Sequence, residues 1–397
     1  MDKDEILSLV EKHERWRGQN CINLIPSENV MSPMVRSLLS SDLGHRYTAR
    51  DRFYMGTRFT DEIEQYGEKL AREVFHSQTA NLRPLSGHIA DLVFLGCFMR
   101  PKDTFLCVSP DDGGYPGIQK RGAPSYLKLR VVSFPFSRER MNIDVDKASD
   151  LILKVRPKAV VFGASRILFP HPMRELAKLA RDVGAHVGFD GSHVLGLIAG
   201  EQFQDPLREG ASVLFGSTHK SFFGPQGGII LADEEHGKVV KSQIFPAFVD
   251  NAHWNRIAAL ALALAEAKKF GKAYAGQVVR NAQALAKALA DVGFPVAGSE
   301  LGFTRSHQVF LDYGGSKRGR KVAQRLEKAN VIVDCGVRVG VCEATRRGMK
   351  EDDMNRIAVF MKRVVIDDEQ PRKIKTEVVK FMTEFQKVNY CFEQLGE

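Results

Sequence analysis

Residues 216–228 read Gly-Ser-Thr-His-Lys-Ser-Phe-Phe-Gly-Pro-Gln-Gly-Gly. A lysine preceded by small hydroxyl residues and followed by a glycine-rich turn is typical of a site that bonds covalently to an aldehyde. Upstream, the apolar run 186–189 ends in Asp190, where a parallel strand would deliver a carboxylate to the open edge of a sheet. Pyridoxal phosphate (PLP) chemistry requires both groups, because the lysine amine forms an imine and the carboxylate keeps the pyridine nitrogen protonated. We therefore predict a PLP site built on Lys220 and Asp190.

Each of these residues also has an ordinary interpretation. A lysine in a loop is usually a solvated charge, and an aspartate after a strand often caps a helix or stabilises a turn. The combination of both residues with the glycine-rich turn favours the catalytic interpretation.

Composition narrows the classes of function. The chain has 397 residues, enough for two domains, and 57 basic against 48 acidic side chains give a formal charge of +9. The basic residues are scattered, so we expect no nucleic-acid partner, and anionic small substrates fit the charge equally well.

The six cysteines lack metal-ligand spacing, so we expect reduced thiols and no metal. The charged N-terminus and the lack of a long apolar run predict a cytoplasmic protein without membrane association.

Apolar runs alternate with amphipathic segments over residues 80–235, which predicts an α/β domain with a mostly parallel sheet. Ligands bind beyond the strand C-termini of such sheets, where Ser165, Asp190 and Lys220 all fall. We expect a large domain over 1–275 and a smaller C-terminal α/β domain over 276–397. The expected strands are 104–109, 131–136, 159–164, 186–190, 213–216, 228–232, 308–311 and 331–333, and the expected helices are 173–183, 256–290 and 374–392.

Several motifs stand in the order found in serine hydroxymethyltransferases, and the resemblance covers residues 20–355. The most specific are Leu-Ile-Pro-Ser-Glu-Asn at 24–29 and Thr-His-Lys at 218–220. The others are Asp-Glu-Ile-Glu at 61–64, Ser-Gly at 86–87, Gly-Ala-Ser at 163–165, Asp190 with His193, and Arg-Val-Gly at 338–340. The resemblance implies the aspartate-aminotransferase-like, type I PLP fold.

The resemblance also implies roles for single residues. Lys220 would form the imine, Asp190 would pair with the pyridine nitrogen, and His193 would lie near the ring hydroxyl. Ser86 and Gly87 would hold the phosphate at a helix N-terminus, where the dipole favours an anion. The remaining implied cofactor contacts are His88, Tyr115, Ser165, Ser217 and His219, and the implied substrate contacts are Ser27, Tyr47, Tyr54 and Arg338.

The chain departs from the family pattern at four places. Ala49 stands where the family has a glutamate used in proton transfer and folate chemistry, so the resemblance implies tetrahydrofolate while this residue argues against it. Phe53 lacks the hydroxyl of a family tyrosine. Asp112 replaces the histidine that stacks on the cofactor ring, which leaves Tyr115 or His88 to cover it. Asp250 replaces a glycine in the loop that reaches the phosphate of the neighbouring subunit, so it would repel that phosphate unless His88 or another cation compensates.

Three functions remain open from the sequence. The first is a PLP enzyme that makes or breaks the Cα–Cβ bond of a small β-hydroxy-α-amino acid, by serine/glycine interconversion or by folate-independent aldol cleavage. The second is an aminotransferase or β-eliminating lyase on the same scaffold. The third is a non-catalytic paralogue, which retention of both Lys220 and Asp190 disfavours. The resemblance also implies a homodimer with shared active sites.

Overall fold

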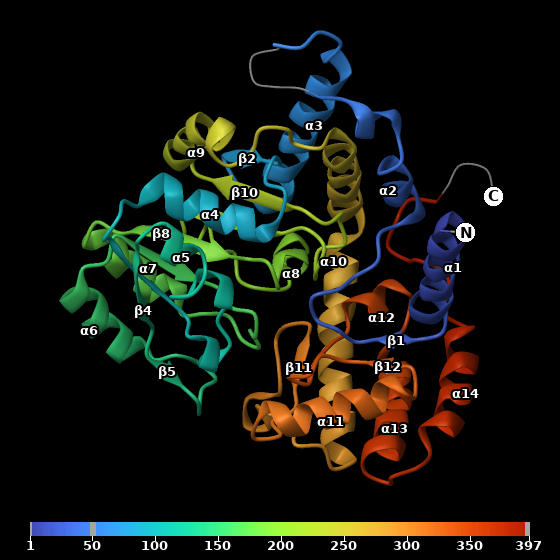
Figure 1. The fold of residues 1–397 in the computed structure, drawn as a ribbon. Coiled ribbons are helices and arrows are strands. Elements are labelled where there is room, and N and C mark those ends of the chain that lie inside the picture. Colours follow the sequence, from blue (N-terminus) through green and yellow to red (C-terminus); the bar gives the residue numbers. More distant parts are fainter. Residues whose placement is uncertain (1, 48–52, 394–397) are drawn as a thin grey trace. The chain divides into compact units, whose positions relative to one another are not determined.

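The computed structural model describes residues 2–47 and 53–393, and the chain divides into two compact units (Figure 1). The large unit comprises Asn29–Ala275 and Tyr390–Glu397, and the small unit comprises Met1–Glu28 and Gly276–Asn389. The sequence prediction had assigned residues 1–28 to the large domain and 390–397 to the small one. No helix within the described ranges is long and apolar enough to cross a membrane.

A seven-stranded sheet forms the core of the large unit, in the order β2-β10-β9-β8-β7-β3-β4. Its strands are β2 (Thr79–Asn81), β3 (Thr104–Cys107), β4 (Arg130–Ser133), β7 (Ala159–Phe162), β8 (His186–Asp190), β9 (Val213–Ser217) and β10 (Gly228–Ala232). The pairs from β4 through β9 are parallel, and β10 is antiparallel to both β9 and β2. The predicted α/β class with a mostly parallel sheet is confirmed.

The central strands are buried on both faces, as their unbroken apolar sequences predict. Strands β7, β9 and β10 are buried at every position. Parallel strands covered by helices on both faces are typically such continuous apolar runs. Because β7, β8 and β9 run in the same direction, the residues that follow them meet at one edge of the sheet.

Helices and short strands complete the large unit. The helix α4 (Gly87–Phe98) packs on β8, β9 and β10, and α7 (Met173–Asp182) packs on β7 and β8. The others are α2 (Pro33–Leu38), η2 (Asp42–His45), α3 (Arg58–Phe75), η4 (Pro110–Asp112), η5 (Pro116–Ile118), α5 (Ala123–Tyr126), β5 (Phe136–Ser137), β6 (Asn142–Ile143), α6 (Val145–Val155), α8 (Leu195–Ala199) and α9 (Glu234–Ala247).

One long helix, α10 (Trp254–Asp291), belongs to both units, since their boundary falls between Ala275 and Gly276. In the small unit, β11 (Gln308–Phe310) pairs with β13 (Arg338–Gly340), and β1 (Ile22–Asn23) pairs with β12 (Val331–Ile332). Its remaining elements are α1 (Asp2–His13), η1 (Glu14–Gln19), η6 (Ser299–Leu301), α11 (Ser316–Glu327), α12 (Cys342–Arg346), α13 (Glu351–Val365) and α14 (Pro371–Met382). The predicted helix 374–392 was too long, because α14 ends at Met382.

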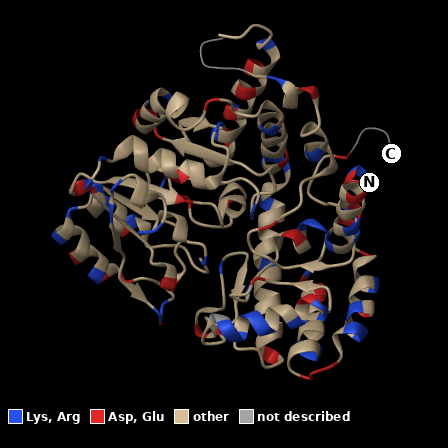
Figure 2. Cartoon of the chain, in the orientation of Figure 1, with Lys and Arg blue, Asp and Glu red and all other residues tan. Residues whose placement is uncertain are grey.

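Charged side chains are spread over both units, with Lys and Arg interspersed among Asp and Glu (Figure 2). Many of the basic residues take part in local ion pairs, such as Arg363 with Glu369 and Glu377, or Lys268 with Glu73. Acidic neighbours therefore partly neutralise the basic residues of both units.

Candidate active site

The candidate site lies at the sheet edge of the large unit where β8 and β9 end. Asp190 is the last residue of β8 and is 7% exposed. Its Oδ1 accepts a hydrogen bond from the Ser192 backbone N–H at 2.9 Å. Gly163, which follows β7 with φ +95°, lies so close that a Cβ there would be 2.0 Å from the Asp190 carbonyl oxygen. This close packing fixes the backbone of Asp190 at the end of its strand.

Strand β9 leads into the lysine loop, which is closed by its own hydrogen bonds. The Thr218 N–H donates to the Gly227 carbonyl at 3.1 Å, and its hydroxyl donates to the Pro225 carbonyl at 2.6 Å. The Gly224 N–H donates back to the Thr218 carbonyl at 2.9 Å. Lys220 is half-buried within this turn. The predicted Gly-Pro-x-Gly-Gly turn thus holds the lysine at the edge where β8 delivers Asp190.

The Ser86-Gly87 turn begins helix α4 at the same edge. Ser86 is the N-cap, and its Oγ accepts from the Ile89 N–H at 3.1 Å. A Cβ on Gly87 would lie 2.2 Å from Ser217 Oγ and 3.1 Å from Ser192 Oγ, so only glycine fits here. Ser192 Oγ in turn accepts from the Ser217 N–H at 2.9 Å. Ser192 therefore links the ends of β8 and β9 beneath the helix N-terminus.

The predicted ring-covering residues lie together. The Tyr115 hydroxyl and His88 Nδ1 are 3.4 Å apart, and their rings are nearly perpendicular at 78°. Burial raises the pKa of Tyr115, with smaller contributions from Asp91 and Asp190. Tyr115 is therefore a neutral phenol within electrostatic range of Asp190.

The other predicted cofactor residues surround this edge. His193 is buried in the turn after β8, and Ser165 lies in the loop after β7. Burial, reinforced by Lys220, lowers the pKa of His219 to about 4. His219 is therefore neutral at physiological pH, and its Nδ1 is buried without a hydrogen-bond partner.

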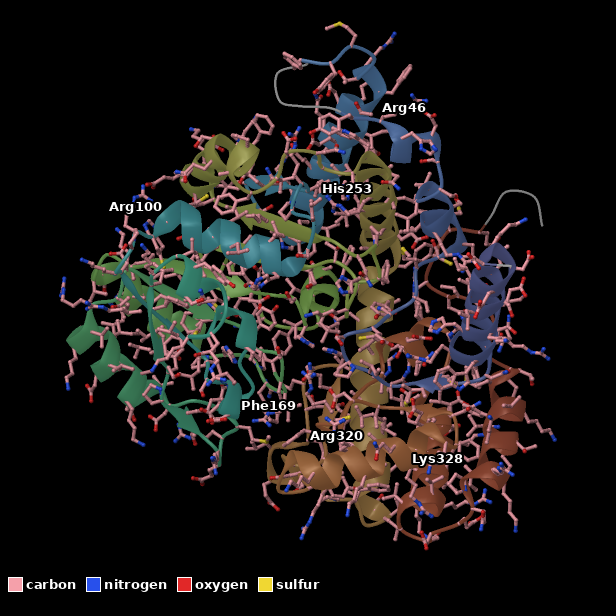
Figure 3. All side chains as sticks on the ribbon, in the orientation of Figure 1. Arg46, Arg100, Phe169, His253, Arg320 and Lys328 are labelled. Atoms are coloured by element: carbon pink, nitrogen blue, oxygen red, sulfur yellow. The ribbon has the colours of Figure 1, made fainter. Side chains whose placement is uncertain are left out.

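Tyr47 and Tyr54 form a separate cluster in the large unit. Their rings meet edge to face with centroids 5.3 Å apart, and the Tyr47 hydroxyl donates to the Asp250 carboxylate. Asp250, which the sequence suggested would repel a phosphate, is thus engaged by a phenol. Ala49 and Asp51 lie outside the described residues. Arg46, which is labelled in Figure 3, pairs with Asp42.

Ser27 and Arg338 belong to the small unit. Arg338 begins β13, and its Nε donates to the Asp334 carboxylate at 2.8 Å. Gly340, two residues later, lies against Pro26, since a Cβ there would be 2.4 Å from Pro26 Cα. The strand therefore brings the segment that holds Ser27 next to the one that holds Arg338.

Two residues at the sheet edge escaped the sequence analysis. Ser192 was passed over because its role depends on the pairing of two strand ends that are distant in sequence. Asp91, an acidic residue within the apolar helix α4, is fully buried near Asp190. An ionisable residue four positions after the phosphate-turn glycine was the signal that could have identified it.

Comparison with known proteins identifies the family. A family model described as serine hydroxymethyltransferase matches residues 1–361. The chain belongs to the serine hydroxymethyltransferase family. Proteins of that name from Methanocella arvoryzae and Pyrococcus abyssi are each 44% identical to it, and the alignments cover 95% and 98% of this chain and 94% and 97% of theirs. The family predicted from the sequence motifs is therefore confirmed.

A solved structure resembles the fold along almost the whole chain. It is L-threonine transaldolase from Pseudomonas fluorescens in its internal aldimine state, with a TM-score of 0.93 and 25% sequence identity. The match covers 99% of this chain and 94% of that one. The predicted type I PLP fold of the serine hydroxymethyltransferase family is confirmed by this likeness.

Proposed function

We propose that the protein is a PLP-dependent enzyme that makes and breaks the Cα–Cβ bond of a small β-hydroxy-α-amino acid, with serine/glycine interconversion as its family reaction. One observation carries the proposal. Lys220, Asp190 and the Ser86-Gly87 turn follow different segments of the chain, yet Ser192 and Ser217 connect them at one edge of one sheet. An amine, a carboxylate and an anion-binding helix N-terminus are the three groups that PLP needs.

The residues present fit this cofactor. Helix α4 has 12 residues, and its first turn offers backbone N–H groups to a phosphate. Ser217 occupies the space that a Cβ on Gly87 would need, so a residue with a side chain does not fit at this turn. Asp190 already holds one backbone N–H on Oδ1, which orients its carboxylate for a second donor.

Each residue then has a defined task. PLP, when bound, supplies the electron-accepting ring that stabilises the electron pair left on Cα. The Lys220 amine would hold the cofactor through its aldehyde carbon, and the Asp190 carboxylate would hold the proton on the pyridine nitrogen. Ser86 and Gly87 bind the phosphate. Because its pKa of about 4 keeps His219 neutral, His219 adds no positive charge beside the Lys220 amine.

We assign the amino-acid carboxylate to Arg338, with Ser27 assisting, on the family resemblance. A guanidinium suits this role because its planar donors match a carboxylate in a bidentate manner. The Asp334 carboxylate holds Arg338 Nε, which fixes the plane of the guanidinium within the small unit.

A second candidate is folate-independent cleavage or transfer on the same amino acids. Two observations favour it: Ala49 replaces the family glutamate, and the structurally similar Pseudomonas fluorescens protein is a threonine transaldolase. A methyl group cannot transfer a proton. On this reading, the protein cleaves a β-hydroxy amino acid without folate and turns over serine with tetrahydrofolate slowly.

Substrate profiling separates these candidates. Purified protein with PLP would be assayed with serine plus tetrahydrofolate, with threonine alone, and with an amino acid plus a keto acid. We expect folate-dependent turnover to rise in Ala49→Glu. Asp51, two residues after Ala49, is a nearby acid that could take the place of the family glutamate. If wild type is already fast and Asp51→Asn abolishes that activity, Asp51 has taken that place and folate chemistry is retained. If wild type turns over serine with tetrahydrofolate rapidly and Asp51→Asn does so too, the proposal that folate chemistry has been lost is contradicted. Activity only with the amino acid plus the keto acid would indicate an aminotransferase.

We further propose a homodimer with shared active sites. Apolar side chains are exposed along the start of α3 and the segment before it, notably Phe53 at 76%, Met55 at 85% and Phe59 at 65%. Tyr47 and Tyr54 adjoin this segment, which supports their contributing to the active site of a second copy.

Light scattering should give twice the mass of the chain. Mixing Lys220→Ala with a Tyr47→Phe/Tyr54→Phe double variant should restore activity that neither has alone, and hybrids that remain inactive would contradict shared sites.

A further inference from the structure

The face of α4 that covers the sheet can be followed residue by residue. At its C-terminal end, the Phe98 ring lies 5.0 Å from that of His186, which begins β8. One turn earlier, Phe94 stacks on Phe215 of β9 at 5.0 Å, and a Cβ on Gly188 would meet the Phe94 ring at 2.7 Å. At the N-terminal end, Gly87 lies against Ser192 and Ser217. The helix therefore runs antiparallel to β8, along the row of side chains that begins with His186.

This register brings Asp91 to Asp190. Asp91 lies four residues after Gly87 and three before Phe94, so all three share one face of the helix. His186, Gly188 and Asp190 share one face of the strand, because side chains alternate in β-structure. Phe94 covers Gly188, and Gly87 lies against Ser192. Asp91, which lies between Gly87 and Phe94 on the helix, therefore lies over Asp190, which lies between Gly188 and Ser192. Two carboxyl groups therefore face each other across the interface between helix and sheet.

The surroundings of Asp91 do not support a negative charge. The residue is 2% exposed, and its Oδ1 is buried without a hydrogen-bond partner. Burial and the neighbouring Asp190 carboxylate raise the pKa of Asp91 well above its usual range, and Lys220 only partly opposes the shift. Tyr115 and Cys107 are also within electrostatic range of Asp91. Burial raises the pKa of Cys107 to about 12, so its thiol is neutral at physiological pH.

We propose that Asp91 is a neutral carboxylic acid at physiological pH and that its O–H is directed at the Asp190 carboxylate. Two facing carboxyl groups in a dry interface do not both ionise, so one keeps its proton. Asp190 Oδ1 accepts a backbone N–H from Ser192, whereas Asp91 Oδ1 has no donor, so we place the shared proton on Asp91. Asp91 is thus a positioning residue that orients Asp190 and keeps the pair at a single negative charge. The importance of Asp91 for catalysis rests on the cofactor role proposed for Asp190. The protonation of Asp91 does not depend on that role.

The first test uses infrared difference spectroscopy on the cofactor-free protein at about pH 7.5. Subtracting the spectrum of Asp91→Asn from that of wild type should reveal the carbonyl stretch of a protonated carboxyl, shifted in heavy water. Glu68→Gln is the matched control. Burial raises the pKa of Glu68 to about 7, so its band should be strong at about pH 5 and weaken as the pH rises through 7. Lack of an Asp91 band at about pH 7.5 would overturn the proposal.

A second variant tests the partnership. Asp190→Asn should keep the Asp91 band but shift its frequency, because the O–H would then donate to a neutral amide in place of a carboxylate. A band that stays at the same frequency would overturn the pairing with Asp190. Both measurements are made without PLP, so failure of Lys220 to bind the cofactor would refute the proposed function and leave the Asp91 result standing.

Stability against pH gives an independent readout if either spectrum is ambiguous. The folded-state pKa of Asp91 is raised, so the native state binds more protons than the unfolded state above the ordinary aspartate range. Wild type therefore loses stability as the pH rises towards the folded pKa of Asp91, by about tenfold in the unfolding equilibrium constant per pH unit. Asp91→Asn removes this term, so its stability relative to wild type should increase with pH. A constant difference between the two proteins would overturn the proposal.

Discussion

Arg338 is one half of an ion pair with Asp334, so the substrate carboxylate that we assign to Arg338 would share its guanidinium. Lysine at this position keeps the charge but loses the planar fork, so one or two charge-assisted hydrogen bonds to the substrate disappear. Each contributes about 1.5–3 kcal/mol, which corresponds to at least a tenfold loss of affinity. We expect Arg338→Lys to raise KM for every amino-acid substrate together.

Arg356→Lys, which alters an exposed ion pair with Glu384 in the same unit, is the control and should leave KM unchanged. If Arg338→Lys weakened PLP binding and left substrate affinity intact, the carboxylate would have to be assigned to another residue.

Residue-level prediction is possible where a motif is contiguous, and it misses residues whose contacts depend on folding. Lys220 is identified by its own loop, because the glycines that close the loop are its sequence neighbours. The roles of Ser192 and Asp91 arise only when β8, β9 and α4 come together. A serine after a strand carries no sequence signal of those contacts, and Asp91 signals only that an ionisable residue interrupts an apolar helix.

At the scale of elements, the approach of α4 to the sheet edge depends on Gly87. An added Cβ would lie 2.2 Å from Ser217 Oγ and 2.9 Å from the Ser217 backbone nitrogen, so the helix N-terminus would have to move. We expect Gly87→Ala to lower PLP affinity at least tenfold while the sheet core still folds. Fluorescence titration with PLP and far-ultraviolet circular dichroism would measure the two effects.

Gly271→Ala is the matched control, since it also lies in a helix of the large unit. Its added Cβ would be 3.6 Å from the Ala199 carbonyl oxygen, an ordinary contact. Alanine favours helix over glycine, so this variant should bind PLP normally and unfold at a slightly higher temperature. Unchanged PLP affinity in Gly87→Ala would mean that this turn does not hold the phosphate.

Strands β8 and β10 were predicted to the residue, because each is a short apolar run between turn signals. The predictions for β3, β4 and β7 extended two or three residues too far, and β2, β5 and β6 were not predicted. The C-terminal helix was predicted too long. Residues after Met382 are held by a different interaction, in which the buried Arg346 donates to the Asn389 carbonyl and accepts from the Asn389 N–H through its own carbonyl. This contact between distant segments overrides the local helical pattern.

At the scale of the whole molecule, the sequence predicted two parts and a family, and the family follows from motifs spread along the chain. It did not predict that residues 1–28 group with the C-terminal part. That grouping depends on the pairing of β1 with β12, which joins strands more than three hundred residues apart. Short two-residue strands give no periodic signal, so only the folded structure reveals it.

The central claim is that Lys220 carries the cofactor at the edge of the sheet. Purified protein would be loaded with PLP, reduced with borohydride and digested, and the labelled peptide would be sequenced by mass spectrometry. We predict that the reduced cofactor is attached to Lys220 alone and that Lys220→Ala retains no label. A label on any other lysine, or no label in protein that has visibly bound PLP, would contradict the account.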